Sequence, residues 1–143
     1  MALTNEQVQL VQKTFMEILP ISDLAAHLFY TRLFQIDPSL KPMFKGDMQE
    51  QGRKLMQMIG MAVQGLSVPS EIMDLVADLG RKHVDYGVID VHYDTVRTAL
   101  MWTLGQGLGA DFTPEARAAW TEAYEFLAKV MKDAAAGKKS NSN

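Results

Sequence analysis

An all-helical fold is predicted for this chain by three observations. Apolar residues recur at intervals of three and four along most of its 143 residues. No segment alternates apolar and polar residues in the way that a half-buried strand does. Residues that begin or end helices separate the apolar runs, among them Pro20, the pair Asp37-Pro38 and Gly109. The sequence therefore predicts six or seven helices and no sheet.

The first two helices are expected on either side of Pro20. Thr4 begins a capping-box pattern, and the apolar positions that follow it lie on one helical face. Ser22 is expected to cap the second helix. That helix should end before the pair Asp37-Pro38, because the residue before a proline disfavours helical geometry. The segment that follows contains two prolines and has space for only a short helical turn or two.

Four longer helices are expected in the remainder of the chain. Asp90 is expected to cap one of them and Thr113 another, since both residue types accept hydrogen bonds from free N–H groups. Pro114 occupies the first helical position, where its missing N–H group costs nothing. The approximate ranges are 48–66, 69–86, 91–108 and 114–136.

The composition limits the classes of protein to which the chain can belong. We expect one domain at residues 1–136, followed by a polar, disordered tail at residues 137–143. The absence of cysteine excludes disulfides, thiolate metal sites and cysteine nucleophiles. A net charge of −3 with scattered Lys and Arg argues against nucleic-acid binding. No apolar run is long enough to span a membrane and no signal-peptide pattern is present, so a cytoplasmic protein is expected.

Two familiar enzyme motifs do not explain the chain. The segment Gly105–Ala110 matches the dinucleotide-binding pattern, but no strand precedes it and it coincides with the end of a helix. Glycines that end a helix explain this match. No serine lies in a strand-turn-helix elbow, and carboxylates such as Glu122 and Glu125 lie on an expected helix surface.

His83 is the most informative of the three histidines. It follows Leu79 by four residues and Val76 by seven, so it lies on the expected buried stripe of its helix. A single imidazole on an apolar face is more often a core histidine with a hydrogen-bond partner than a metal ligand. An iron ion would equally satisfy one ring nitrogen. Both alternatives stay open from this residue alone.

Four residues that precede His83 in the chain, when they are taken together, favour the interpretation of His83 as an iron ligand. Gln51 and Leu55 lie one turn apart on one helix, and Phe44 shortly precedes that helix. Tyr30 lies in an otherwise apolar helical segment. Each of them has a simpler explanation as core filler or as a surface residue. In combination, a histidine facing a tyrosine and a glutamine suits a haem with one protein ligand and a polar gas complex.

Five segments in combination carry a family resemblance that covers residues 4–134. They are His27–Phe34, Pro38–Phe44, Gln51–Leu55, Lys82-His83 and Ala119–Tyr124. Through them the sequence resembles the globins, and among them the haem domain of bacterial flavohaemoglobins and single-domain bacterial haemoglobins. The resemblance implies a globin fold, a three-over-three helical sandwich around haem b, with His83 as the iron ligand.

The resemblance also implies which residues surround the cofactor. Tyr30 and Gln51 would lie above the distal face of the haem as the catalytic residues. Leu55 would line that face, and Phe44 would pack on the porphyrin. The lysines beside the pocket could reach the propionates, although solvation at the surface explains them equally well. The remaining expected haem contacts are Lys54, Leu79, Lys82, Val88, Tyr93 and Val96.

Two features differ from the flavohaemoglobin pattern. Nothing follows residue 143, so the flavin- and nicotinamide-binding reductase is expected to be absent. Ala135 stands where the family has a glutamate beside the proximal histidine, so Tyr93 loses its partner. Asp133 should point elsewhere on its helix. The ring N–H of His83 should then bond a backbone carbonyl one turn earlier, such as that of Leu79.

Two classes of function follow from the resemblance. In the first, the protein is a nitric oxide dioxygenase: oxygen bound to ferrous iron reacts with nitric oxide to give nitrate, and a separate flavin reductase restores the iron. In the second, it stores, delivers or senses oxygen, nitric oxide or carbon monoxide without turnover. Tyr30 and Gln51 favour the first class, because their hydrogen bonds retain oxygen. The missing reductase favours the second. A sensor of the same fold without haem is a third alternative, against which His83 and Phe44 argue.

Overall fold

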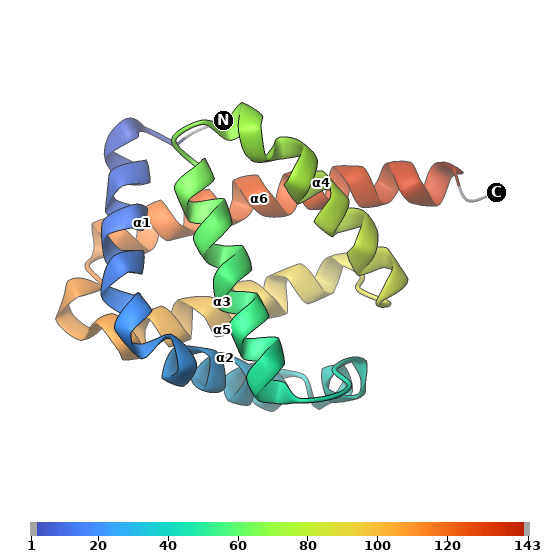
Figure 1. Cartoon of the computed structure of the whole chain (residues 1–143), viewed down its shortest axis with the longest axis horizontal. Helices are drawn as coiled ribbons and strands as arrows, with labels where there is room; N and C mark the ends of the chain where they lie inside the picture. The colour runs from blue at the N-terminus through green and yellow to red at the C-terminus, as the bar shows by residue number, and fades with distance from the viewer. Residues whose placement is uncertain (1–2, 142–143) are drawn as a thin grey trace.

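The structure is a computed structural model that describes residues 3–141, with side chains described for residues 3–137. Six α-helices joined by short turns form this part of the chain, and no strand occurs within it (Figure 1). The predicted all-helical class is therefore confirmed. The α-helices are α1 (Asn5–Ile18), α2 (Ser22–Ile36), α3 (Met48–Gly65), α4 (Pro69–Asp85), α5 (Asp90–Leu108) and α6 (Pro114–Asn141). The short 3-10 helices are η1 (Leu19–Ile21), η2 (Pro38–Met43) and η3 (Gly109–Asp111).

Local signals explain how two of these helices begin. Thr4 accepts a hydrogen bond from the N–H group of Gln7 at 3.1 Å, and the Gln7 side chain accepts one from the N–H group of Thr4 at 3.0 Å. This is the expected capping box. Thr113 caps α6 by accepting a hydrogen bond from the N–H group of Ala116 at 3.1 Å. Both predicted caps are confirmed.

Two other predicted caps are wrong. Ser22 is the first residue of α2, because η1 leads directly into that helix and the N–H group of Ser22 bonds the carbonyl of Leu19. Asp90 is the first residue of α5. At that end, His92 supplies the acceptor, since its Nδ1 lies 3.1 Å from the N–H nitrogen of Ile89.

The last helix of the described chain, α6, has a backbone that continues to Asn141, within the segment 137–143 for which a disordered tail was expected. The disordered state of that segment stays a prediction. The three alanines 134–136 have the highest helix propensity and lead into that segment, which explains the extension. Residues 142–143 lie outside the described part of the chain, and the domain boundary at residue 136 stays a prediction. At the end of α5, Gly109 has a φ of 56°, which is the helix-ending role expected of it.

Two apolar clusters form the core. The larger one joins α1, α2, α3, α5 and α6, and Trp120 lies within it. The indole N–H of Trp120 donates to Thr14 at 2.8 Å, so this buried polar group is satisfied. The smaller cluster joins α2, η2, α3 and α5, and it contains Tyr30, Phe44, Leu55 and Val96. Most of the residues expected on the distal side therefore share one cluster. No helix of the described chain is long and apolar enough to cross a membrane.

The arrangement of α3 and α4 positions the candidate site. The two helices approach each other beside the turn that joins them, where Ile72 lies against Gly65. From that turn they diverge (Figure 1). α3 packs on α1 and α2, whereas α4 packs mainly on α6. Gln51 lies near the start of α3 and His83 near the end of α4, so both residues belong to the open side of this arrangement.

Candidate haem site

His83 has the protonation state that a metal ligand needs. Its Nδ1 lies 2.5 Å from the carbonyl oxygen of Leu79, one turn earlier on α4. This hydrogen bond assigns the proton to Nδ1 and leaves the lone pair on Nε2, for which no partner occurs among the described residues. Burial lowers the pKa of His83, although the bond to Leu79 opposes this effect. The ring is therefore neutral at pH 7 and can ligate a metal through Nε2.

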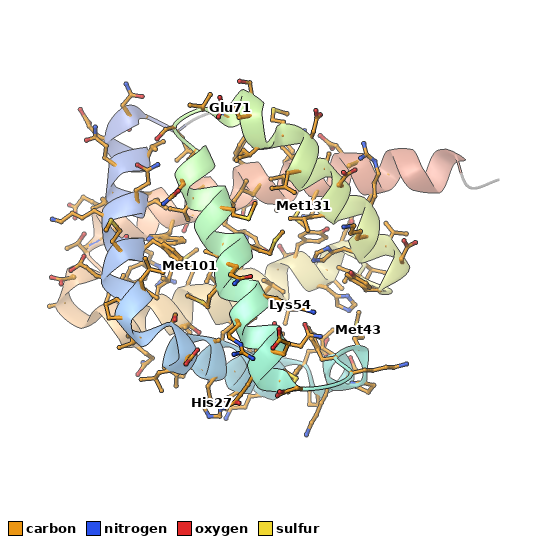
Figure 2. All side chains as sticks on the ribbon, viewed as in Figure 1. His27, Met43, Lys54, Glu71, Met101 and Met131 are labelled. Atoms are coloured by element: carbon orange, nitrogen blue, oxygen red, sulfur yellow. The ribbon has the colours of Figure 1, made fainter. Side chains whose placement is uncertain are left out.

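Gly80 positions the helix that carries His83. This glycine is buried where α4 crosses α6, and a Cβ atom added to it would lie 2.3 Å from the carbonyl oxygen of Met131. Figure 2 shows the labelled Met131 at this crossing. The backbone of α4 thus rests directly on the backbone of α6, three residues before His83. The sequence offers one signal for this role, since a glycine inside a helix is unfavourable unless packing requires it.

Tyr30 lies on α2 in an aromatic environment. Its ring packs edge-to-face on Phe29 and on Phe44, each at 5.2 Å between centroids, and it stacks on Phe34 at 6.0 Å. Burial raises the pKa of Tyr30 to about 12, so its hydroxyl group stays protonated at neutral pH. Within the described part of the chain this hydroxyl has no hydrogen-bond partner. It is therefore available to donate to a ligand.

Some of the other residues expected on the distal side lie in the same cluster as Tyr30. Phe44 follows η2 and packs on both Tyr30 and Phe34, and Leu55 and Val96 belong to the same cluster. Gln51 is half-buried, one turn before Leu55 on α3, and its side-chain amide has no partner among the described residues. Among the described residues, no hydrogen bond joins the side chains of Gln51 and Tyr30. Phe34 was not expected at the site, although it lies one turn after Tyr30, where a residue on the same helical face belongs.

The remaining expected contacts occupy varied environments. Leu79 and Val88 are half-buried, whereas Lys54 and Lys82 are exposed. Their roles toward a cofactor stay predictions. Tyr93 is buried, and its carbonyl accepts a hydrogen bond of 2.7 Å from the hydroxyl group of Tyr124.

Neither of the two α6 positions considered for a proximal carboxylate supplies one to His83. Ala135 is buried, and Asp133 is exposed and pairs with Lys129 at 3.0 Å. Asp133 therefore points elsewhere, as expected, and the predicted bond from His83 to Leu79 is confirmed. The sequence did not predict the position of Lys132, whose ammonium group lies 5.3 Å from the centre of the Tyr93 ring. A cation thus lies beside Tyr93, the residue for which the resemblance implied a glutamate partner.

These residues fit a haem better than a bare metal ion. The described residues contain no group of three or more His, Asp or Glu side chains that could hold a metal. A single neutral imidazole suits a metal whose other ligands come from a porphyrin. Half-buried apolar side chains from several elements offer the surface that such a ring would cover. Removing apolar surface from water stabilises the complex by about 25 cal/mol per Å². The half-buried side chains are Phe44, Leu55, Leu79, Val88 and Val96.

The fold and the site define a class of helical haem proteins with one imidazole opposite a polar distal side. The chain belongs to the globin family, whose model matches residues 27–131. Membership of this family implies haem as the cofactor and a diatomic gas as the ligand.

Similar proteins agree with this assignment. The chain is 32% identical to leghemoglobin-1 of Lupinus luteus, over 93% of this chain and 98% of that protein. It is 33% identical to a flavohemoprotein of Xylella fastidiosa, over 73% of this chain but only 27% of that protein. A solved structure of an engineered carbene transferase is similar with a TM-score of 0.87 and 25% identity, over 97% of both chains. Its parent, from Rhodothermus marinus, is proposed to be a nitric oxide dioxygenase. The predicted globin fold is confirmed.

Proposed function

We propose that this globin binds haem b through His83 and converts nitric oxide and oxygen to nitrate in the cytoplasm. The observation that carries the proposal is the Tyr30 hydroxyl group, which is protonated, free of protein partners and surrounded by aromatic rings. When bound, the haem would supply an iron that takes up a diatomic gas and exchanges electrons. A separate flavin reductase would return those electrons.

The surroundings of Tyr30 support retention of a polar ligand. A hydrogen bond from a hydroxyl group in a site shielded from water contributes about 1–3 kcal/mol, or roughly tenfold to a hundredfold in affinity. Phe29, Phe34 and Phe44 pack on the Tyr30 ring, and Tyr30 is buried. The Gln51 amide is a second donor without a protein partner. Slow release favours a reaction of the held ligand over its delivery elsewhere.

One of the comparisons supports the same reaction. The similar solved structure derives from a protein proposed to be a nitric oxide dioxygenase, and a flavohemoprotein is among the relatives. The chain aligns with about a quarter of the flavohemoprotein, so an electron donor outside the matched region is part of the proposal.

Reversible binding without turnover is the second candidate function, and the proximal side favours it. The His83 N–H group bonds a backbone carbonyl, and Ala135 provides no acceptor. A neutral imidazole donates less electron density to iron than one that is hydrogen-bonded to a carboxylate. This environment is compatible with storage or sensing of oxygen, carbon monoxide or nitric oxide.

Stopped-flow mixing tests the proposal. The haem-loaded, oxygenated protein is mixed with nitric oxide, and nitrate is quantified. We expect one nitrate per protein in a fast phase, and repeated cycles when a flavin reductase and nicotinamide are added. Tyr30→Phe should lower the nitrate yield, whereas Ser70→Ala, which removes an exposed hydroxyl group at the start of α4, should not. If wild-type protein forms nitrate only as slowly as it releases oxygen, reversible binding is the function.

A further inference from the structure

A groove opens to solvent on the outer side of Tyr30, between α2 and the first turns of α3. Its volume is about 590 Å³, which is within the range of small-molecule sites. In Figure 2 the labelled His27, one of its residues, lies at the lower edge of the molecule. Its floor consists of the buried or half-buried Ala26, Tyr30, Phe34, Met48 and Gly52. Its rim consists of the exposed Asp23, Leu24, His27, Thr31, Gln49 and Arg53.

Tyr30 is the wall that the groove shares with the candidate haem site. Tyr30 is one of the residues that line the groove, and its ring packs edge-to-face on Phe44 at 5.2 Å. Phe44 belongs to the same apolar cluster as Leu55 and Val96, which are expected to contact the haem. Tyr30 and Phe34, which line the groove, therefore also pack on Phe44 and on the cluster where the haem contacts are expected.

The helices on both sides of the groove are held in close contact. A Cβ atom on Gly52 would lie 2.9 Å from the Cβ atom of Ala26, so two of the smallest side chains form this part of the floor. The backbone is fixed there, whereas aromatic side chains can change rotamer on a much faster timescale than helices move. Motion of Tyr30 and Phe34 is thus the easiest way to open the floor.

The groove suits a small uncharged molecule. Asp23 and the Arg53 guanidinium carry opposite charges, and Arg53 is already paired with Glu50 at 2.5 Å. No excess of one sign therefore selects an ion. The apolar floor favours molecules that partition out of water, as oxygen and nitric oxide do.

We propose that this groove is the access route by which diatomic gases reach the distal side of the haem, with Tyr30 and Phe34 as its gate. The inference rests on the proposed haem site and does not require the conversion of nitric oxide. A barrier on the route slows arrival and departure by the same factor, because it leaves the free energies of the free and bound states unchanged. A change in distal polarity instead alters the affinity.

Flash photolysis of the carbon monoxide complex, with oxygen dissociation measured alongside, tests the route. Gln49→Trp places a large side chain over the groove from its exposed rim. We expect association and dissociation to slow together by about fivefold, which corresponds to about 1 kcal/mol of added barrier. Thr31→Trp, on the α2 side of the rim, provides an independent second variant with the same expected direction. Gln57→Trp is the matched control, since Gln57 is exposed on α3 and does not line the groove.

Three outcomes distinguish the gas access route from the proposed dioxygenase function. Unchanged rates in both rim variants, with an intact Soret band, would overturn the route. A change in dissociation alone would also overturn it, because the tryptophan would then act on the bound ligand. Slower binding in the rim variants of a protein that forms no nitrate would support the route and contradict the dioxygenase function.

Discussion

Replacement of Gly80 by alanine should loosen the helix that carries His83. The added Cβ atom would lie 2.3 Å from the carbonyl oxygen of Met131 and 2.6 Å from its Cα atom, whereas ordinary contact begins at 3.4 Å. Both atoms belong to the backbone of α6, so no side-chain rotation relieves the clash. The backbone of α4 must therefore move away by roughly 1 Å to make room, since close-packed interiors hold no spare volume.

Two opposing terms determine how much Gly80→Ala changes the free energy of unfolding. Alanine is about 1 kcal/mol more favourable than glycine inside a helix. Forcing an extra methyl group into a packed contact costs about 1–3 kcal/mol. We expect the free energy of unfolding to fall by about 1–2 kcal/mol, because the contacts in question are to backbone. His83 lies one turn away and moves with α4, so haem should also be lost faster.

Urea unfolding of the apoprotein and transfer of haem to an excess of apomyoglobin measure the two effects. Gly105→Ala is the matched control, since Gly105 lies inside α5 and its added Cβ atom would meet Phe112 at an ordinary 3.7 Å. This control should leave haem transfer unchanged and should stabilise the chain slightly. Equal stability and equal haem retention in the two variants would refute the argument that Gly80 positions His83.

Tyr30→Phe should speed oxygen dissociation by about tenfold and change carbon monoxide release far less, because carbon monoxide polarises less on binding; equal effects on both gases would indicate a steric role. Burial raises the pKa of Tyr30 to about 12 from 10.0. The contribution of the protonated Tyr30 hydroxyl to the free energy of unfolding is therefore complete below pH 10 and is lost as the pH rises toward 12. Tyr30→Phe should therefore lose less stability than wild type between those pH values in urea titrations, and an identical loss would contradict the burial of this hydroxyl. Thr14→Val leaves the indole N–H of Trp120 without its acceptor, so unfolding free energy should fall by about 1–3 kcal/mol in urea titrations. Ala135→Glu should raise the iron–histidine stretching frequency in resonance Raman spectra of the ferrous, unliganded protein, because a carboxylate then competes for the N–H group of His83; an unchanged frequency would show that position 135 does not reach this histidine.

Interactions between neighbours in the chain could be read from the sequence. The helical periodicity, the capping of α1 by Thr4 and the bond from His83 to the Leu79 carbonyl all join residues three or four positions apart. Such pairs meet in any helix, so residue type and spacing suffice to predict them. The caps expected at Ser22 and Asp90 were wrong because the turns before α2 and α5 satisfy those N–H groups in another way.

Interactions between helices were decided by the tertiary structure. The contact of Gly80 with Met131, the Lys132 ammonium group over the Tyr93 ring and the groove beside Tyr30 each join different helices. Their geometry depends on where helices cross and how closely they approach, which periodicity does not specify. The neutral form of His83 depends on both a local interaction and tertiary packing. Its hydrogen bond is local, whereas the burial that lowers its pKa exists only once α4 has packed on α6.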